Sequence, residues 1–95
     1  MNIVVTKRAE LNYKSIKRYI TKEFGEKASD EFDLKTINFL DLLANFPLIG
    51  SMEVPAKNIR GFQLAKQTRV IYRLKNETII VLNFFHVRQS PVKKL

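Results

Sequence analysis

Residues 68–74 read Thr68-Arg69-Val70-Ile71-Tyr72-Arg73-Leu74, and this stretch decides the fold. Its side chains alternate with a period of two, so that Val70, Tyr72 and Leu74 share one face and Arg69, Ile71 and Arg73 share the other. This period predicts a β-strand with one covered face. Residues 78–86 are almost continuously apolar, as expected of a central strand that is covered on much of both faces. Residues 62–65 alternate upstream, and the predicted turns between these strands are Lys66-Gln67 and Lys75-Asn76-Glu77.

Two segments nearer the N-terminus repeat their apolar residues every three or four positions, which is the period of an amphipathic helix. The first runs from Lys7 to Phe24, with Thr6 as the expected N-cap and Gly25 as an αL C-cap. Its expected apolar face holds Ala9, Tyr13, Ile16, Ile20 and Phe24. The second runs from about Glu26 to Asn45 and stops before Pro47. Its expected apolar face holds Ala28, Phe32, Phe39, Leu40, Leu43 and Phe46, widened by Ile37 and Leu42.

A short β-branched run, Ile3-Val4-Val5, adds a strand before the helices, and residues 47–58 are expected to form an irregular connection. The order is then β-α-α-β-β-β within one domain that covers residues 1–95. We expect an α+β fold in which an α-helical hairpin packs on one face of a small antiparallel β-sheet.

The positive charge of the chain is concentrated in its C-terminal part. Residues 1–56 hold eight lysines and arginines and eight acidic residues, whereas residues 57–95 hold nine basic residues and Glu77 alone, so the net charge of +8 arises in the second segment. A basic surface gathered on one structural unit favours a polyanionic partner, either a nucleic acid or an acidic protein. We expect the partner-binding cations to be Lys57, Arg60, Lys66, Arg69, Arg73 and Arg88.

The chain has no cysteine, its start lacks the apolar region of a signal peptide, and its most apolar run falls well short of the roughly 20 residues that span a bilayer. These features lead us to expect a cytoplasmic protein. We find no metal-ligand cluster, phosphate-binding glycine loop or nucleophile motif, so no cofactor and no metal are expected.

Arg69, His86 and Arg88 could form a site for cleaving an RNA phosphodiester. Such cleavage needs a base for the 2′-hydroxyl, positive charge on the phosphorane, and an acid for the leaving oxygen. The two arginines would clamp the phosphate and His86 would act as acid or base, with Glu53 as a weaker candidate for the opposing base. The alternative is structural, because arginines on a strand can keep its outer face hydrated and a histidine at a strand end can simply support the fold.

The C-terminal half resembles the RelE/ParE toxins. The resemblance is carried by Gln67-Thr68-Arg69-Val70-Ile71-Tyr72-Arg73-Leu74, by the aliphatic run 78–82, and by the close His86-Val87-Arg88-Gln89-Ser90-Pro91, with Phe46-Pro47-x-x-Gly50 matching further upstream. It implies a helical hairpin on a curved antiparallel sheet, and a toxin of a bacterial type II toxin–antitoxin system that is neutralised by a cognate antitoxin.

The resemblance leaves two targets open. RelE-like members are ribosome-dependent mRNA endoribonucleases, whereas ParE-like members inhibit DNA gyrase and lack the nuclease residues. Arg69 matches the strand arginine of the nucleases, Arg88 matches the closing arginine, and His86 matches the C-terminal histidine of one nuclease branch. The terminal tyrosine of the nucleases has no counterpart after His86, and their lysine pair is represented only by Lys57 and Lys66. The resemblance therefore favours gyrase as the target over the ribosome and its mRNA.

Overall fold

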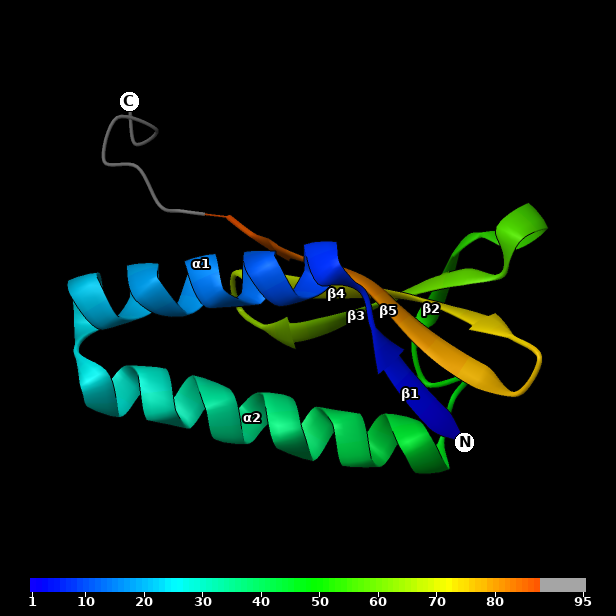
Figure 1. Cartoon of the computed structure of the whole chain (residues 1–95), viewed down its shortest axis with the longest axis horizontal. Coiled ribbons are helices and arrows are strands. Elements are labelled where there is room, and N and C mark those ends of the chain that lie inside the picture. The colour runs from blue at the N-terminus through cyan, green and yellow to red at the C-terminus, as the bar shows by residue number, and fades with distance from the viewer. Residues whose placement is uncertain (88–95) are drawn as a thin grey trace.

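The computed structural model describes residues 1–87, which form two long helices and a five-stranded sheet (Figure 1). The helices are α1 (Lys7–Phe24) and α2 (Glu26–Asn45). The strands are β1 (Asn2–Val5), β2 (Ser51–Val54), β3 (Ile59–Ala65), β4 (Thr68–Lys75) and β5 (Thr78–His86), with one turn of 3-10 helix, η1 (Pro55–Lys57), between β2 and β3. The α+β fold predicted from the periodicities is confirmed, with a helical hairpin after an N-terminal strand.

The strands lie in the order β1-β5-β4-β3-β2. Consecutive strands from β2 to β5 pair antiparallel, as predicted for β3 to β5, whereas β1 lies parallel to β5 at the edge of the sheet, which is therefore mixed. Strand β2 occupies part of the region that was expected to be irregular. Its polar and apolar residues do alternate, but the run is only four residues long between Gly50 and Pro55, and all four residues are exposed.

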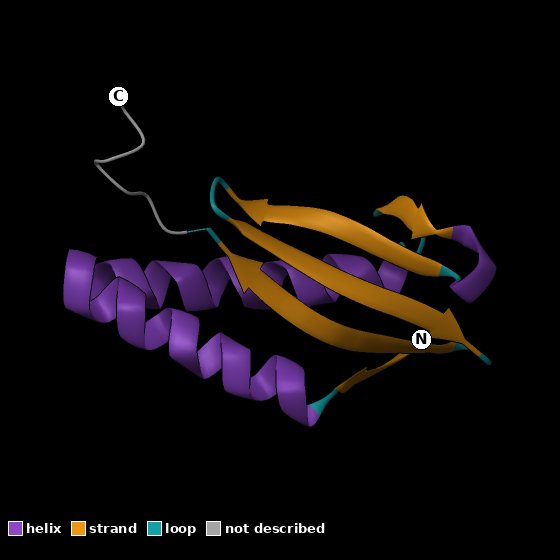
Figure 2. Cartoon of the chain, turned by 90° about the horizontal axis from the view of Figure 1, so that it is seen from above, coloured by secondary structure: helices purple, strands orange, loops and turns teal. Residues whose placement is uncertain are grey.

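Both helices pack against the same face of the sheet, which we call the covered face (Figure 2). Its fully buried apolar side chains include Val70 and Tyr72 of β4 and Ile79 and Val81 of β5. They pack with helix residues Ile16, Ile20, Phe32, Phe39 and Leu43 in one core. The face turned away from the helices, the open face, carries Arg69, Ile71 and Arg73, as the alternation in β4 predicts.

The two helices meet at Gly25, which serves both of them. Its N–H donates to the Thr21 carbonyl at the end of α1, and its own carbonyl accepts from Ser29 in the first turn of α2. The φ of 95° is positive and favours glycine, but the ψ of 171° lies outside the αL region, so the predicted αL C-cap is wrong. The predicted N-cap at Thr6 is confirmed, since its side chain accepts from the Ala9 N–H at 3.1 Å.

Each predicted apolar helix face is wider than the face that is buried. Phe24, Ile37 and Phe46 are more than half exposed, and Leu42 is 38% exposed. These residues stay exposed because only a narrow arc of each helix touches the sheet. The buried stripe of α2 also contains two hydroxyl residues, Ser29 and Thr36. Within residues 1–87, neither helix is long and apolar enough to cross a membrane.

A polar clasp joins the two helices across the hairpin. Asp33 of α2 accepts hydrogen bonds of 2.5 Å from the Tyr13 hydroxyl and from the Lys17 ammonium, both on α1. Burial raises the pKa of Tyr13, and its hydrogen bond to Asp33 raises it further. Burial alone would raise the pKa of Asp33 too, but the hydrogen bonds from Lys17 and Tyr13 outweigh it and lower that pKa below its ordinary value.

Candidate functional site

The predicted site residues lie on both faces of the sheet. In the register of β4 and β5, Thr68 is opposite His86 and Arg69 is opposite Phe85. Thr68 is 1% exposed and lies on the covered face with Val70, whereas Arg69 lies on the open face. His86 therefore points to the helices and Arg69 points away from them, although the two residues are near the same end of the sheet.

On the open face, Arg69 is the centre of a small polar cluster. Its guanidinium forms an ion pair with the Glu53 carboxylate of β2. It also donates to the Gln63 side-chain oxygen at 3.3 Å and to the Ser51 hydroxyl at 3.5 Å. The side chains of Arg69 and Glu53 are 34% and 33% exposed, so the ion pair remains accessible to solvent. Glu53, the weaker candidate for the catalytic base, is thus the direct partner of Arg69, one of the two predicted phosphate clamps.

Two local features bring Glu53 to Arg69. The register between β2 and β3 shifts between Met52 and Val54, which makes Glu53 the extra residue of a bulge and re-aims its side chain. Beneath the pair lies Gly61 of β3, where a Cβ atom would collide with the Glu53 carboxylate and lie 2.7 Å from the Arg69 guanidinium. A glycine at this position therefore leaves the space that the ion pair occupies.

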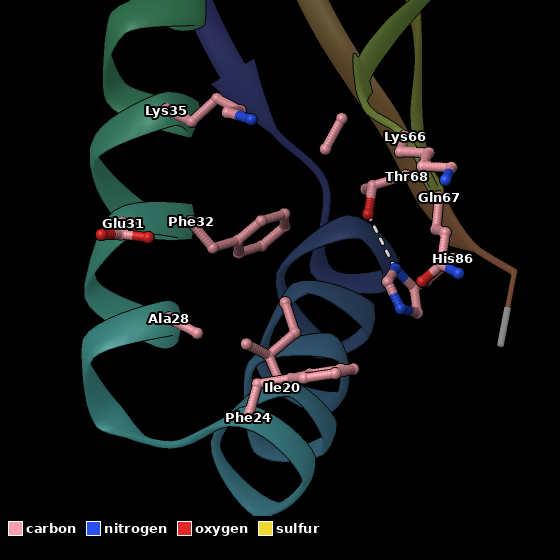
Figure 3. A pocket seen from close by; sticks show the side chains of 11 residues that line it. Ile20, Phe24, Ala28, Glu31, Phe32, Lys35, Lys66, Gln67, Thr68 and His86 are labelled. Atoms are coloured by element: carbon pink, nitrogen blue, oxygen red, sulfur yellow. Dashed lines mark hydrogen bonds between the residues drawn. The ribbon is translucent and has the colours of Figure 1, made fainter. Parts of the chain in front are cut away.

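His86 belongs to a different environment on the covered face. Its Nδ1 forms a 2.7 Å hydrogen bond with the Thr68 hydroxyl, and its ring lies 5.4 Å from the ring of Tyr19 of α1. It borders a cavity of about 480 Å³ between the tip of the helical hairpin and the β3–β4 turn. Figure 3 shows its imidazole facing Thr68, with Lys66 on the same wall and Lys35 on the opposite, helical wall.

The remaining predicted cations are dispersed. Arg60 lies on the covered face, where its Nη1 donates to the backbone carbonyls of Gly50 at 2.8 Å and Leu48 at 3.3 Å. Lys57 is exposed in η1, and Lys66 is exposed in the β3–β4 turn. Arg73 is on the open face of β4, where Ile71 separates it from Arg69. Arg88 lies outside the described residues. The five predicted cations that lie within residues 1–87 thus do not form one continuous cluster.

The loop after α2 is held in place by side chains of the sheet, which the sequence did not predict. The Tyr72 hydroxyl donates to the Pro47 carbonyl at 2.9 Å and accepts from the Gly50 N–H at 2.8 Å, so that Tyr72 and Arg60 together hold this loop by its backbone. Burial raises the pKa of Tyr72, although the hydrogen bond from Gly50 and the charge of Arg60 oppose it. The Phe-Pro-x-x-Gly spacing was the available signal, because a Cβ on Gly50 would come within 2.7 Å of the Gly61 carbonyl oxygen.

The family of the chain is identified by comparison with protein-family models. A family model described as the ParE toxin of the type II toxin–antitoxin system parDE matches residues 3–91. A search of curated proteins finds no match. Among solved structures, the chromosomal ParDE toxin–antitoxin system from P. aeruginosa is similar with a TM-score of 0.76 and 18% identity, over 93% of this chain and 97% of that chain.

Two further structures have the same fold. The YoeB/ParE toxin from Agrobacterium tumefaciens has a TM-score of 0.63 at 12% identity, covering 93% of this chain and 100% of that chain. The YoeB–YefM complex from Staphylococcus aureus has a TM-score of 0.60 at 15% identity, covering 93% and 98% of the two chains.

Proposed function

The chain belongs to the ParE toxin family of type II toxin–antitoxin systems, and we propose that it inhibits growth by binding DNA gyrase and not by cutting RNA. The RelE/ParE resemblance of its sequence implies these two activities as the alternatives. Gyrase inhibition requires a binding surface, whereas RNA cleavage requires an acid, a base and a phosphate clamp around one phosphate.

The observation that carries this proposal is the separation of Arg69 from His86. A catalytic acid must reach the same phosphodiester that the arginine clamps, but alternation along paired strands directs these two side chains to opposite faces of the sheet. The Arg69 guanidinium is also already neutralised by Glu53. His86 in turn hydrogen bonds to the buried Thr68 hydroxyl, which suits a structural role. The arrangement therefore favours binding over nuclease chemistry.

We further propose that the toxin acts in the cytoplasm, where a cognate antitoxin neutralises it. Solved structures with this fold are described as toxin–antitoxin complexes, which supports a partner of this kind. The open face combines Arg69 and Arg73 with apolar Ile71 and with Phe85, which is 53% exposed. An acidic amphipathic segment could cover such a surface by coupled folding and binding, and charge attraction would speed the association.

Two reactions with the purified protein test the target. We expect the toxin to block DNA supercoiling by gyrase, and to leave the message intact in a translation reaction. The His86→Ala variant should inhibit gyrase as well as the parent chain does. Inhibited translation with cut message, abolished by His86→Ala, would instead establish the endoribonuclease and overturn the proposal.

A further inference from the structure

We propose that Arg69 forms a carboxylate-binding site on the open face, that Glu53 is its internal occupant, and that an acidic segment of a protein partner binds by displacing Glu53. This inference rests on the proposed function in one respect, namely that the open face receives the antitoxin. It adds a site, a ligand class and a competitor within the chain itself.

The site has the features of a built anion site. Arg69 supplies fixed charge and a planar set of donors that match a carboxylate. Gln63 and Ser51 lie beside the guanidinium, within 3.3 and 3.5 Å of its nitrogens, and orient it over the strand. Gly61 provides the floor, because any side chain there would fill the space now taken by the Glu53 carboxylate. The resident carboxylate thereby marks the position that an incoming one would take.

Glu53 is held in a way that allows it to leave. Both side chains of the ion pair are about one-third exposed, so water and a partner can reach them. Strand β2 is four residues long, is exposed at every position, and lies at the edge of the sheet with β3 as its neighbour. The bulge interrupts even this pairing at Glu53. Rotation of the Glu53 side chain therefore disturbs no part of the core.

The surroundings of the site favour a protein over a nucleic acid. Ile71 follows Arg69 on the open face of β4, and Phe85 lies directly opposite Arg69 on β5 with 53% of its surface exposed. A phosphate backbone gains nothing from these apolar neighbours, whereas an amphipathic peptide can place a carboxylate on Arg69 and apolar side chains on Ile71 and Phe85. The charge and the apolar area are both complementary to such a segment.

Because Glu53 competes for Arg69 within the chain, it lowers the apparent affinity of Arg69 for a carboxylate of the partner. Binding requires the fraction of molecules in which Arg69 is not paired with Glu53, so the measured dissociation constant rises as that fraction falls. Removing the charge of Glu53 should thus tighten binding at Arg69, beyond the general effect of adding one positive charge to the protein. Replacing Arg69 should abolish the difference that Glu53 makes.

A double-mutant cycle with a matched charge control tests this. The probe is a short synthetic peptide that alternates glutamate and leucine, and its binding is followed by fluorescence anisotropy at two salt concentrations. The variants are Glu53→Gln, Arg69→Gln and the double variant, with Glu77→Gln as the control because it makes the same change of net charge in the β4–β5 turn. Thermal unfolding of each variant verifies that the fold is retained.

We expect Glu53→Gln to tighten peptide binding about five- to tenfold, the size of a partly exposed charge-assisted contact. Glu77→Gln should change it by less than about twofold, because a distant surface charge is largely screened. In the Arg69→Gln background, Glu53→Gln should have no effect. A gain shared by Glu77→Gln, a gain that persists without Arg69, or no peptide binding to Glu53→Gln would each overturn the site.

A single-stranded RNA of equal charge distinguishes the occupant. A gain for RNA as large as the gain for the peptide would overturn the assignment to a protein partner. These binding measurements do not depend on gyrase, so failure of the site and failure of the proposed target are separate results.

Discussion

The two faces of the sheet are built from alternate residues of the same strands, and they serve different purposes. On the covered face, Val70 and Tyr72 are fully buried, and even polar groups such as the Thr68 hydroxyl are used to join elements together. On the open face, Arg69 and Glu53 pair with each other in partial contact with solvent, next to exposed Phe85. The comparison indicates that one set of side chains stabilises the fold and the other is available to a partner.

The largest effect expected from this comparison concerns two adjacent isoleucines of β5. Ile79 is fully buried on the covered face, whereas Ile80 is half-buried on the open face opposite Arg73. We expect Ile79→Ala to lower the free energy of unfolding by about 2–5 kcal/mol, through lost transfer energy and a cavity. Ile80→Ala should lower it by about 1 kcal/mol or less. Urea denaturation measures both, and equal losses would contradict the division into two faces.

The next effect concerns the loop that the covered face holds. Tyr72→Phe removes the hydroxyl that bonds the Pro47 carbonyl and the Gly50 N–H, and so leaves buried backbone groups without their partner. The expected loss is about 1–3 kcal/mol in the free energy of unfolding. Thermal unfolding and hydrogen exchange at Gly50 provide the measurement. A variant as stable as the parent chain would show that the loop does not depend on Tyr72.

Two glycines sharpen the comparison further. At Gly50 an added Cβ would lie 2.7 Å from the backbone oxygen of Gly61, and backbone cannot easily move. At Gly61 it would meet the flexible ends of Glu53 and Arg69. We expect Gly50→Ala to cost about 1–3 kcal/mol of stability, and Gly61→Ala to cost less than about 1 kcal/mol while it displaces the ion pair. Denaturation midpoints of the two variants should differ in this order, and the reverse order would refute the assignment.

The smallest effect is a pH dependence that arises between the helices and not at the sheet. The pKa of Asp33 is lowered in the folded chain, so the clasp contributes stability above the ordinary pKa of 3.8, and this contribution is lost as pH falls through the lowered value. Because Lys17 and Asp33 are each about one-third exposed, the effect should be no more than about 1 kcal/mol.

Denaturation at pH 6 and at pH values of about 2–3 measures this loss. The Asp33→Asn variant should lose less stability on acidification than the parent chain does. Asp30→Asn, on the exposed side of the same helix, is the matched control and should behave as the parent chain. An acid dependence that is unchanged in Asp33→Asn would contradict the role of the clasp.

The long periodic elements could be predicted from the sequence because their signals are local. Helix α1 was expected over Lys7–Phe24 and is observed there, and the strands expected over residues 68–74 and 78–86 are observed as Thr68–Lys75 and Thr78–His86. Strand β2 was not predicted, because its alternating run Ser51-Met52-Glu53-Val54 is only four residues long and lies between Gly50 and Pro55, which are typical of an irregular connection. The parallel pairing of β1 with β5 was equally hidden, because it joins residues more than 70 positions apart.

The candidate site was predictable in composition but not in arrangement. Arg69 and Glu53 were both candidates, yet the bulge that brings them together leaves no trace in the sequence around Met52. Because Arg69 and His86 lie near the ends of neighbouring strands, the sequence predicted that they act together. Their separation follows from the pairing of Thr68 with His86, and a shift of register by one residue would have reversed it.

Composition and local periodicity were enough to establish an α+β domain whose basic residues gather in its C-terminal part, and the resemblance of its C-terminal half to a known family added the expectation of a toxin. Contacts between distant segments determined on which face of the sheet each of those residues lies and which groups its side chain contacts. The physical reason is that periodicity reports which side chains share a face of one element, whereas the element's orientation and register toward its neighbours depend on packing across the whole domain.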